Sequence, residues 1–206
     1  MHSRTQQAEA EQKNYWKTAL GARPSSFLFP KLNPTCTSTQ RTNFIQMNAL
    51  PSASEMLQQS RSLGLSLQSV FLAAWAITQS SYTKGSHEAI FGLWNAGRNA
   101  DVEGLEDLDY PCMNVLPFCI RFGNDMTPRD KAVLVQEELM KRTPIVEQSN
   151  LVDIDEWVHG HQKPLHNVFV NILGLPGMGG SIDEVHPLLQ PLEVCQILIR
   201  APFIPN

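Results

Sequence analysis

Apolar residues recur at three- and four-residue steps in several stretches of the chain, which is the period of an amphipathic helix. The clearest stretch follows Ser66 and places apolar side chains at Leu67, Val70, Phe71, Ala74 and Ile77. Capping residues, glycines and prolines then predict where each helix begins and ends. The predicted helices cover about residues 11–20, 52–63, 66–82, 127–143 and 150–160, and residues 1–12 are expected to form a loose polar lead-in.

Short apolar runs predict the strands. They cover residues 89–94, 115–122, 167–173 and 194–199, and residues 42–47 are a further candidate. Pro117 interrupts the second run, which suits an edge strand or a bulge because proline has no N–H to donate. The third run is expected to be a central strand. Leaving out the further candidate, the order α-α-α-β-β-α-α-β-β predicts an α/β fold in which helices pack on a mixed sheet.

The composition of the 206 residues permits a folded core and excludes several classes of partner. Hydrophobic residues make up 42% and charged residues 17%, and the net charge is −4. A chain without a basic run is not expected to bind nucleic acid or a membrane surface. The longest nearly apolar run, Val70–Ile77, is too short to span a bilayer, and the polar N-terminus does not resemble a secretory signal. Four scattered cysteines without a CxxC pair fit a reduced, cytoplasmic setting.

Three common kinds of binding or catalytic motif are not predicted. His159, His161 and His166 lack the spacing of a zinc site, and a helix end followed by a loop is the simpler interpretation. The glycine-rich residues 177–180 are not followed by the helix and the Gly-Lys-Ser/Thr sequence of a phosphate-binding loop. No Gly-x-Ser-x-Gly sequence is present. We therefore expect no metal site and no cofactor bound directly by the chain.

The first of two unusual loops, residues 91–99, runs from a strand into a tight turn that contains Gly97 and Arg98. A sharp reversal is needed there, between a strand and an acidic segment. Gly97 is therefore predicted to adopt a backbone conformation that other residues avoid.

The second loop, residues 111–121, is an uncharged run that holds Asn114 and Pro117 and ends at Arg121. An asparagine buried in such a run needs hydrogen-bond partners. Asn114 and Arg121 are therefore expected to anchor the backbone. On that interpretation Asn114→Ala lowers the free energy of unfolding by ~1–3 kcal/mol.

These loops resemble two motifs of the condensation domains of nonribosomal peptide synthetases, particularly fungal ones. Residues 91–98 resemble the segment FGxxxxGR of that family. Pro111, Asn114 and Pro117 resemble the motif GPxxNxxPxR. Two residues depart from that motif, Tyr110 in place of Gly and Cys119 in place of Arg.

The resemblance extends outward in the same order, over about residues 12–200. Residues 15–21 are similar to the family's YWxxxLxG segment but one residue short of it, and residues 63–82 are similar to the helices before the strand with Phe91 and Gly92. Residues 153–157 and 164–168 are similar to a later helix and a PLFxT-like strand, with His166 where Phe is common. Each motif alone is short, so the resemblance rests on their order and spacing.

The resemblance implies one lobe of a fold like that of chloramphenicol acetyltransferase, a CoA-dependent acyltransferase. In the family, two lobes enclose a tunnel that receives the phosphopantetheine arms of carrier (thiolation) domains. An acceptor amine there attacks a donor thioester and an amide forms. Four residues are the expected tunnel or structural motif residues, namely Gly97, Arg98, Asn114 and Pro117.

The family's catalytic motif HHxxxDG does not occur in the sequence. Residues 13–206 are therefore expected to be the C-terminal lobe of a condensation domain, without the catalytic N-terminal lobe and without the closing strand and helix. We expect this lobe to be inactive alone, with carrier domains and an N-terminal lobe as its partners. Two alternatives remain open: a non-catalytic module that docks a carrier or another synthetase piece, and a lobe of another CoA-dependent acyltransferase.

Overall fold

The computed structural model describes residues 2–21, 53–83, 87–95, 113–146, 148–159 and 166–172. The elements are α1 (His2–Leu20), α2 (Ala53–Ser62), α3 (Leu67–Tyr82), β1 (Glu88–Asn95), β2 (Asn114–Arg121), α4 (Pro128–Val146), α5 (Leu151–His159) and β3 (Phe169–Val170). The predicted strands at 42–47 and 194–199 lie outside the described residues. Within the described ranges, no helix combines the length and the apolar character that crossing a membrane requires.

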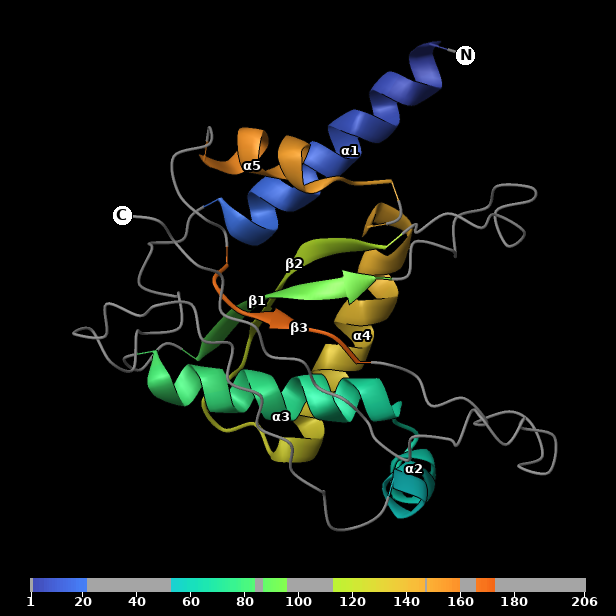
Figure 1. The fold of residues 1–206 in the computed structure, drawn as a ribbon, viewed down its shortest axis with the longest axis vertical. Helices are drawn as coiled ribbons and strands as arrows, with labels where there is room; N and C mark the ends of the chain where they lie inside the picture. The colour runs from blue at the N-terminus through green and yellow to red at the C-terminus, as the bar shows by residue number, and fades with distance from the viewer. Residues whose placement is uncertain are drawn as a thin grey trace, which may run out of the picture.

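A small mixed sheet lies between the helices, as the sequence predicts. Its described strands have the order β2-β1-β3. β2 pairs with β1 in antiparallel register, from Glu88 opposite Arg121 to Asn95 opposite Asn114, and β3 runs parallel to β1. Figure 1 shows α1 and α5 together on one side of the sheet and α3 on the other.

Pro117 lies in β2, the strand at one edge of the described sheet. The position confirms the prediction of an edge strand or a bulge for this proline. Its ring is buried opposite Gly92 of β1.

The prediction of a central strand over residues 167–173 is wrong for the described part of the chain. β3 covers only Phe169–Val170, and it lies at the edge opposite β2. Val168 and Val170 are nevertheless 2% and 1% exposed. The Val168 carbonyl accepts a hydrogen bond from the Gly92 N–H at 2.8 Å. Burial against β1 therefore accounts for the apolar character of this run within the described residues.

The first hydrophobic core joins the sheet to α3 and α4. Ala89, Phe91 and Leu93 contribute alternate side chains of β1, as the two-residue period of a strand requires. The Phe91 and Phe118 rings stack with their centroids 5.3 Å apart and an interplanar angle of 28°. Leu72 and Val135, both fully buried, bring α3 and α4 into this core.

The second core joins the sheet to α1, α5 and the end of α4. Its buried members are Trp16, Leu20, Ile90, Leu116, Val146 and Ile154. Ile90 comes from the face of β1 opposite Phe91, so the two cores lie on opposite faces of that strand.

Local capping signals in the sequence are confirmed at three helix ends. The Ser66 Oγ accepts a hydrogen bond from the Ser69 N–H at 3.0 Å and begins α3. Gly64, just after α2, has φ +72°. The Asn150 Oδ1 accepts a hydrogen bond from the Asp153 N–H at 2.9 Å and begins α5.

α1 begins at His2, so the prediction of a loose lead-in over residues 1–12 is wrong in its conformation. The sequence before Gly21 contains neither glycine nor proline, and it is rich in Ala, Gln and Glu. These residues have high intrinsic helix propensity. The prediction was wrong because it relied on the polarity of these residues and not on their helix propensity.

α4 continues to Val146, although the sequence predicts that Thr143 and Pro144 end it. Proline inside a helix removes one backbone hydrogen bond and crowds the carbonyl four residues earlier. Ile145 and Val146 compensate because they pack into the second core, where Val146 is 5% exposed. Tertiary burial therefore extends the helix past its local stop signal.

Candidate functional site

Pairing of β1 with β2 brings the two sequence motifs side by side. β1, which holds Phe91 and Gly92 of the first motif, lies over its whole length against β2, which holds Asn114 and Pro117. Asn95 lies directly opposite Asn114 at one end of this pair. Residues 96–112 connect these two positions, so Gly97 and Arg98 follow β1 at that same end in the sequence. Both residues lie outside the described part of the chain, and the predicted conformation of Gly97 stays a prediction.

Asn114 is half-buried at the first position of β2. Its Oδ1 atom is buried without a hydrogen-bond partner among the described residues. The neighbouring Asn95 uses its own amide differently, because its Nδ2 donates to the Leu93 carbonyl at 2.9 Å. The anchoring hydrogen bonds expected of the Asn114 carbonyl oxygen are therefore not found within the described residues.

Arg121 lies at the opposite end of β2 and forms an ion pair with Glu88 across the sheet. The Arg121 side chain is 70% exposed and the Glu88 side chain 5% exposed. The pair closes the end of the two strands away from Asn114. A structural role for Arg121, as predicted, agrees with this contact.

Gly92 marks a close approach that the sequence analysis did not single out. A Cβ atom at this position would lie 2.5 Å from the His166 Nε2 and 2.7 Å from the Phe169 Cδ1. Only glycine therefore allows the segment before β3 to lie directly on the sheet. A glycine inside a predicted strand is the signal that could have identified this position.

His166 is 6% exposed, and its ring meets the Phe169 ring edge-on with centroids 4.9 Å apart. Its Nδ1 atom is buried without a partner among the described residues. Burial lowers the pKa of this imidazole to about 4, because the charged form loses its hydration. The neutral ring thus packs as an aromatic side chain, which explains how His can stand where the resemblance leads one to expect Phe.

The histidines give no metal centre in the described part of the chain. There, no three His, Cys, Asp or Glu side chains lie close enough together to hold an ion. His161 lies outside the described residues, and so does the side chain of His159.

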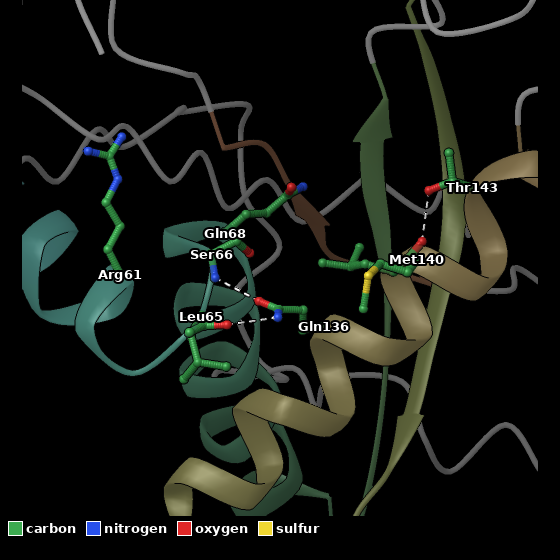
Figure 2. A pocket seen from close by; sticks show the side chains of 9 residues that line it. Arg61, Leu65, Ser66, Gln68, Gln136, Met140 and Thr143 are labelled. Carbon is green, nitrogen blue, oxygen red and sulfur yellow. Dashed lines mark hydrogen bonds between the residues drawn. The ribbon is translucent and has the colours of Figure 1, made fainter. Parts of the chain in front are cut away.

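A surface groove of about 540 Å³ lies away from these motifs, between the α2–α3 turn and α4. Figure 2 shows Gln136 reaching from α4 to this turn, where its Oε1 accepts from the Ser66 N–H at 2.7 Å and its Nε2 donates to the Gly64 carbonyl at 3.1 Å. None of the residues that line the groove belongs to the candidate site residues.

We expect Asn114→Ala to change the free energy of unfolding by less than about 1 kcal/mol, because no described hydrogen bond to its carbonyl oxygen is lost. This revises the loss that the sequence alone suggests. Urea unfolding of the variant beside Asn95→Ala, which removes a defined hydrogen bond, measures the difference. A loss above about 2 kcal/mol for Asn114→Ala would show that the amide is anchored after all.

Comparison with known proteins shows which proteins the chain is similar to. No family model matches the chain. It is 36% identical over 98% of its length to nonribosomal peptide synthetase NPS2 of Ceriporiopsis subvermispora. It is 32% identical over 91% of its length to coprinoferrin synthetase of Coprinopsis cinerea, and 32% identical over 89% to the ferrichrome siderophore peptide synthetase of Mycosarcoma maydis. The chain spans 8%, 8% and 4% of the lengths of these relatives.

Solved structures agree on the fold. A four-domain nonribosomal peptide synthetase crystallised with AMP and glycine matches 94% of this chain with a TM-score of 0.68 and 20% identity, over 15% of its own length. The condensation domain of the monacolin K polyketide synthase MokA matches 80% of this chain with a TM-score of 0.58 and 14% identity, over 48% of its own length. The fold is thus part of the CoA-dependent acyltransferase fold of condensation domains. Over most of its length the chain is thus similar in sequence to segments of fungal nonribosomal peptide synthetases, and its fold is that of a part of their condensation domains.

Proposed function

We propose that residues 13–206 form the C-terminal lobe of a condensation domain, preceded by the first turns of α1. Together with an N-terminal lobe that carries HHxxxDG, this lobe encloses the tunnel for amide formation. The observation that carries the proposal is the pairing of β1, which holds Phe91 and Gly92, with β2, which holds Asn114 and Pro117, since it sets parts of the two motifs side by side. The identity to fungal synthetases over most of the chain supports the same assignment.

The proposed reaction joins two carrier-bound groups. The acceptor amine attacks the carbonyl carbon of the donor thioester, the C–S bond breaks, and the released thiol takes up a proton as the amide forms. The N-terminal lobe supplies the histidine that assists this proton transfer. His166 is unsuited to that role, because it is buried against Gly92 and Phe169 and its pKa of about 4 makes it a weak base.

Asn114 is the described residue that we propose faces the substrates. Its Oδ1 is a buried acceptor with no described partner, at the end of β2 where residues 96–112 connect to the sheet. Such an atom suits an N–H group of the acceptor amine or of a phosphopantetheine arm. Gly97 and Arg98 belong to the same end by connectivity, whereas Pro117 is buried and supports the strand.

The phosphopantetheine arms belong to carrier domains, which are the proposed partners. In this proposal the chain binds no cofactor of its own and contacts the arm only while a carrier is docked. The amino acids that are joined are set outside these residues, by the loading of the carriers.

The test is reconstitution with the separately expressed N-terminal lobe of the 36%-identical relative. A donor carrier bearing an aminoacyl thioester and an acceptor carrier bearing a free amine are mixed with the chain, the N-terminal lobe, or both. We expect amide product by mass spectrometry only with both lobes. We also expect Asn114→Ala to reduce its rate by roughly tenfold, the effect of one hydrogen bond to a polar substrate.

The controls separate the alternatives. Asn95→Ala, one strand away, is expected to leave the rate within about twofold, because its amide already bonds to the Leu93 carbonyl. Binding of a carrier by the chain without any amide product from both lobes would favour a docking module. Acyl transfer from coenzyme A in place of a carrier would favour another acyltransferase.

A further inference from the structure

A cation is buried between the two cores without a direct ion pair among the described residues, although the charge of Glu138 partly opposes the effect of burial on its pKa. Arg142 of α4 is 3% exposed, and its Nη1 and Nη2 atoms have no hydrogen-bond partner among the described residues. The guanidinium carbon lies 4.9 Å from the centroid of the Phe118 ring and 5.9 Å from that of Trp16. Burial lowers the pKa of Arg142 to about 10. Two aromatic faces offset part of the lost hydration, but a buried unpaired charge remains costly.

A suitable counter-ion lies one turn away but is engaged elsewhere. Glu138 precedes Arg142 by four residues on α4, which is the favourable order for an ion pair on a helix. The Glu138 Oε1 instead accepts a hydrogen bond from the Tyr15 hydroxyl at 2.8 Å. No ion pair between Glu138 and Arg142 is found in the described part of the chain.

Side chains of α1 both engage Glu138 and cover Arg142 on α4. Tyr15 occupies the carboxylate, and Trp16 lies over the guanidinium. α1 is held by apolar burial, with Trp16 1% and Leu20 2% exposed, and by the Trp16 Nε1–H, which donates to the Ser149 Oγ at 2.9 Å. Docking of α1 therefore gains apolar contacts and gives up the hydration of Arg142.

We propose that α1 is a releasable helix, whose docking competes with a Glu138–Arg142 ion pair that forms on α4 when Tyr15 and Trp16 leave. The undocked state recovers the charge pair in water, while α3, α4 and the sheet keep the first core intact. α1 then opens at a lower free energy than the whole domain unfolds. This inference does not depend on the proposed function.

Amide hydrogen exchange of the intact chain tests the opening directly. We expect amides of residues 9–20 to exchange at least roughly tenfold faster than those of α3 and β1, because they open without global unfolding. Equal protection of α1 and β1 would overturn the proposal, because α1 would then leave only when the whole domain unfolds.

Arg142→Met tests the competition, because methionine fills the space of the arginine stem without a charge. We expect α1 amides to exchange roughly tenfold more slowly in this variant and the melting temperature to rise. Lys141→Met, next to it on α4 and exposed, is the matched control and is expected to leave exchange within about twofold. Faster exchange or a lower melting temperature in Arg142→Met would overturn the proposal, since it would reveal a counter-ion that the substitution removed.

Tyr15→Phe tests whether the hydrogen bond from Tyr15 to Glu138 helps to hold α1 in place. Loss of the hydroxyl removes the hydrogen bond that holds docked α1 to Glu138, while the ion pair of the undocked state is unaffected. We therefore expect α1 amides to exchange roughly tenfold faster while those of α3 stay unchanged. Uniform acceleration across α1, α3 and β1 would contradict a separate opening of α1.

Discussion

Gly92→Ala is expected to lower the free energy of unfolding by about 1–3 kcal/mol, the usual cost of forcing extra atoms into a packed site. The added methyl group would lie 2.5 Å from the His166 Nε2 and 2.7 Å from the Phe169 Cδ1. Neither neighbour can move away easily, since His166 is buried and Phe169 is part of β3. The strain is therefore expected to push β3 away from β1. Urea unfolding followed by far-UV circular dichroism measures the loss.

Gly123→Ala is the matched control for this substitution. Its Cβ would come within 3.3 Å of the Met126 Cγ, which belongs to a flexible side chain, so the expected change is within about 0.5 kcal/mol. His166→Ala in the Gly92→Ala background is expected to recover part of the loss, because the nearest blocking atom is removed. Equal midpoints for wild type and Gly92→Ala would show that β3 does not pack on the sheet as described.

Elements with a complete local signal could be predicted from the sequence. α3 has apolar residues at helical steps, a Ser66 cap and no breaker inside, and the structure places it within one residue of the predicted range. β1 is likewise a short apolar run bounded by polar residues, and its first six residues are buried. In β1 the residues that define the element locally also fill the core. In α3 the buried face is instead formed by Ser69, Leu72, Ala73, Ala76 and Gln79, whereas the residues that predicted the helix are half-buried or, at Ala74, exposed.

Elements whose limits depend on distant packing could not be predicted in full. α4 passes Pro144 because Val146 is buried in the second core and Ile145 packs against it, and no local pattern reports that packing. The segment before β3 lies on the sheet next to Gly92, a contact between segments more than seventy residues apart that no local pattern reports. Long-range contacts of this kind override local propensity.

For the candidate site, too, the sequence predicts the residue types but not their partners. Asn114 and Pro117 could be selected as motif residues, but only the register with β1 shows that the Asn114 side chain lies at the end where residues 96–112 leave the sheet. The roles of Gly92, His166 and Arg142 arise from pairs far apart in sequence. Chemistry at a site thus follows from residue types, whereas burial and partners follow from the fold.

Acid is expected to weaken the domain through His166. The folded-state pKa of this imidazole is lowered to about 4 from an ordinary value of 6.5, because burial disfavours the charged ring. Between these values the unfolded chain binds more protons than the folded one, so stability rises with pH across this window. The contribution of the neutral ring is complete above pH 6.5 and is lost as the pH falls toward 4. The loss amounts to about 3 kcal/mol at most, since one pKa unit corresponds to about 1.4 kcal/mol.

Urea unfolding of wild type and His166→Phe at pH 7 and pH 4.5 isolates this effect from the carboxylates, which titrate in both proteins. Phenylalanine suits the site because the ring already packs edge-on against Phe169 under Gly92. We therefore expect His166→Phe to lose about 2 kcal/mol less than wild type between the two pH values. His87→Asn, which changes an exposed histidine just before β1, is expected to behave like wild type. An identical loss in wild type and His166→Phe would mean that His166 is hydrated in the folded protein, and that the segment before β3 does not bury it on the sheet.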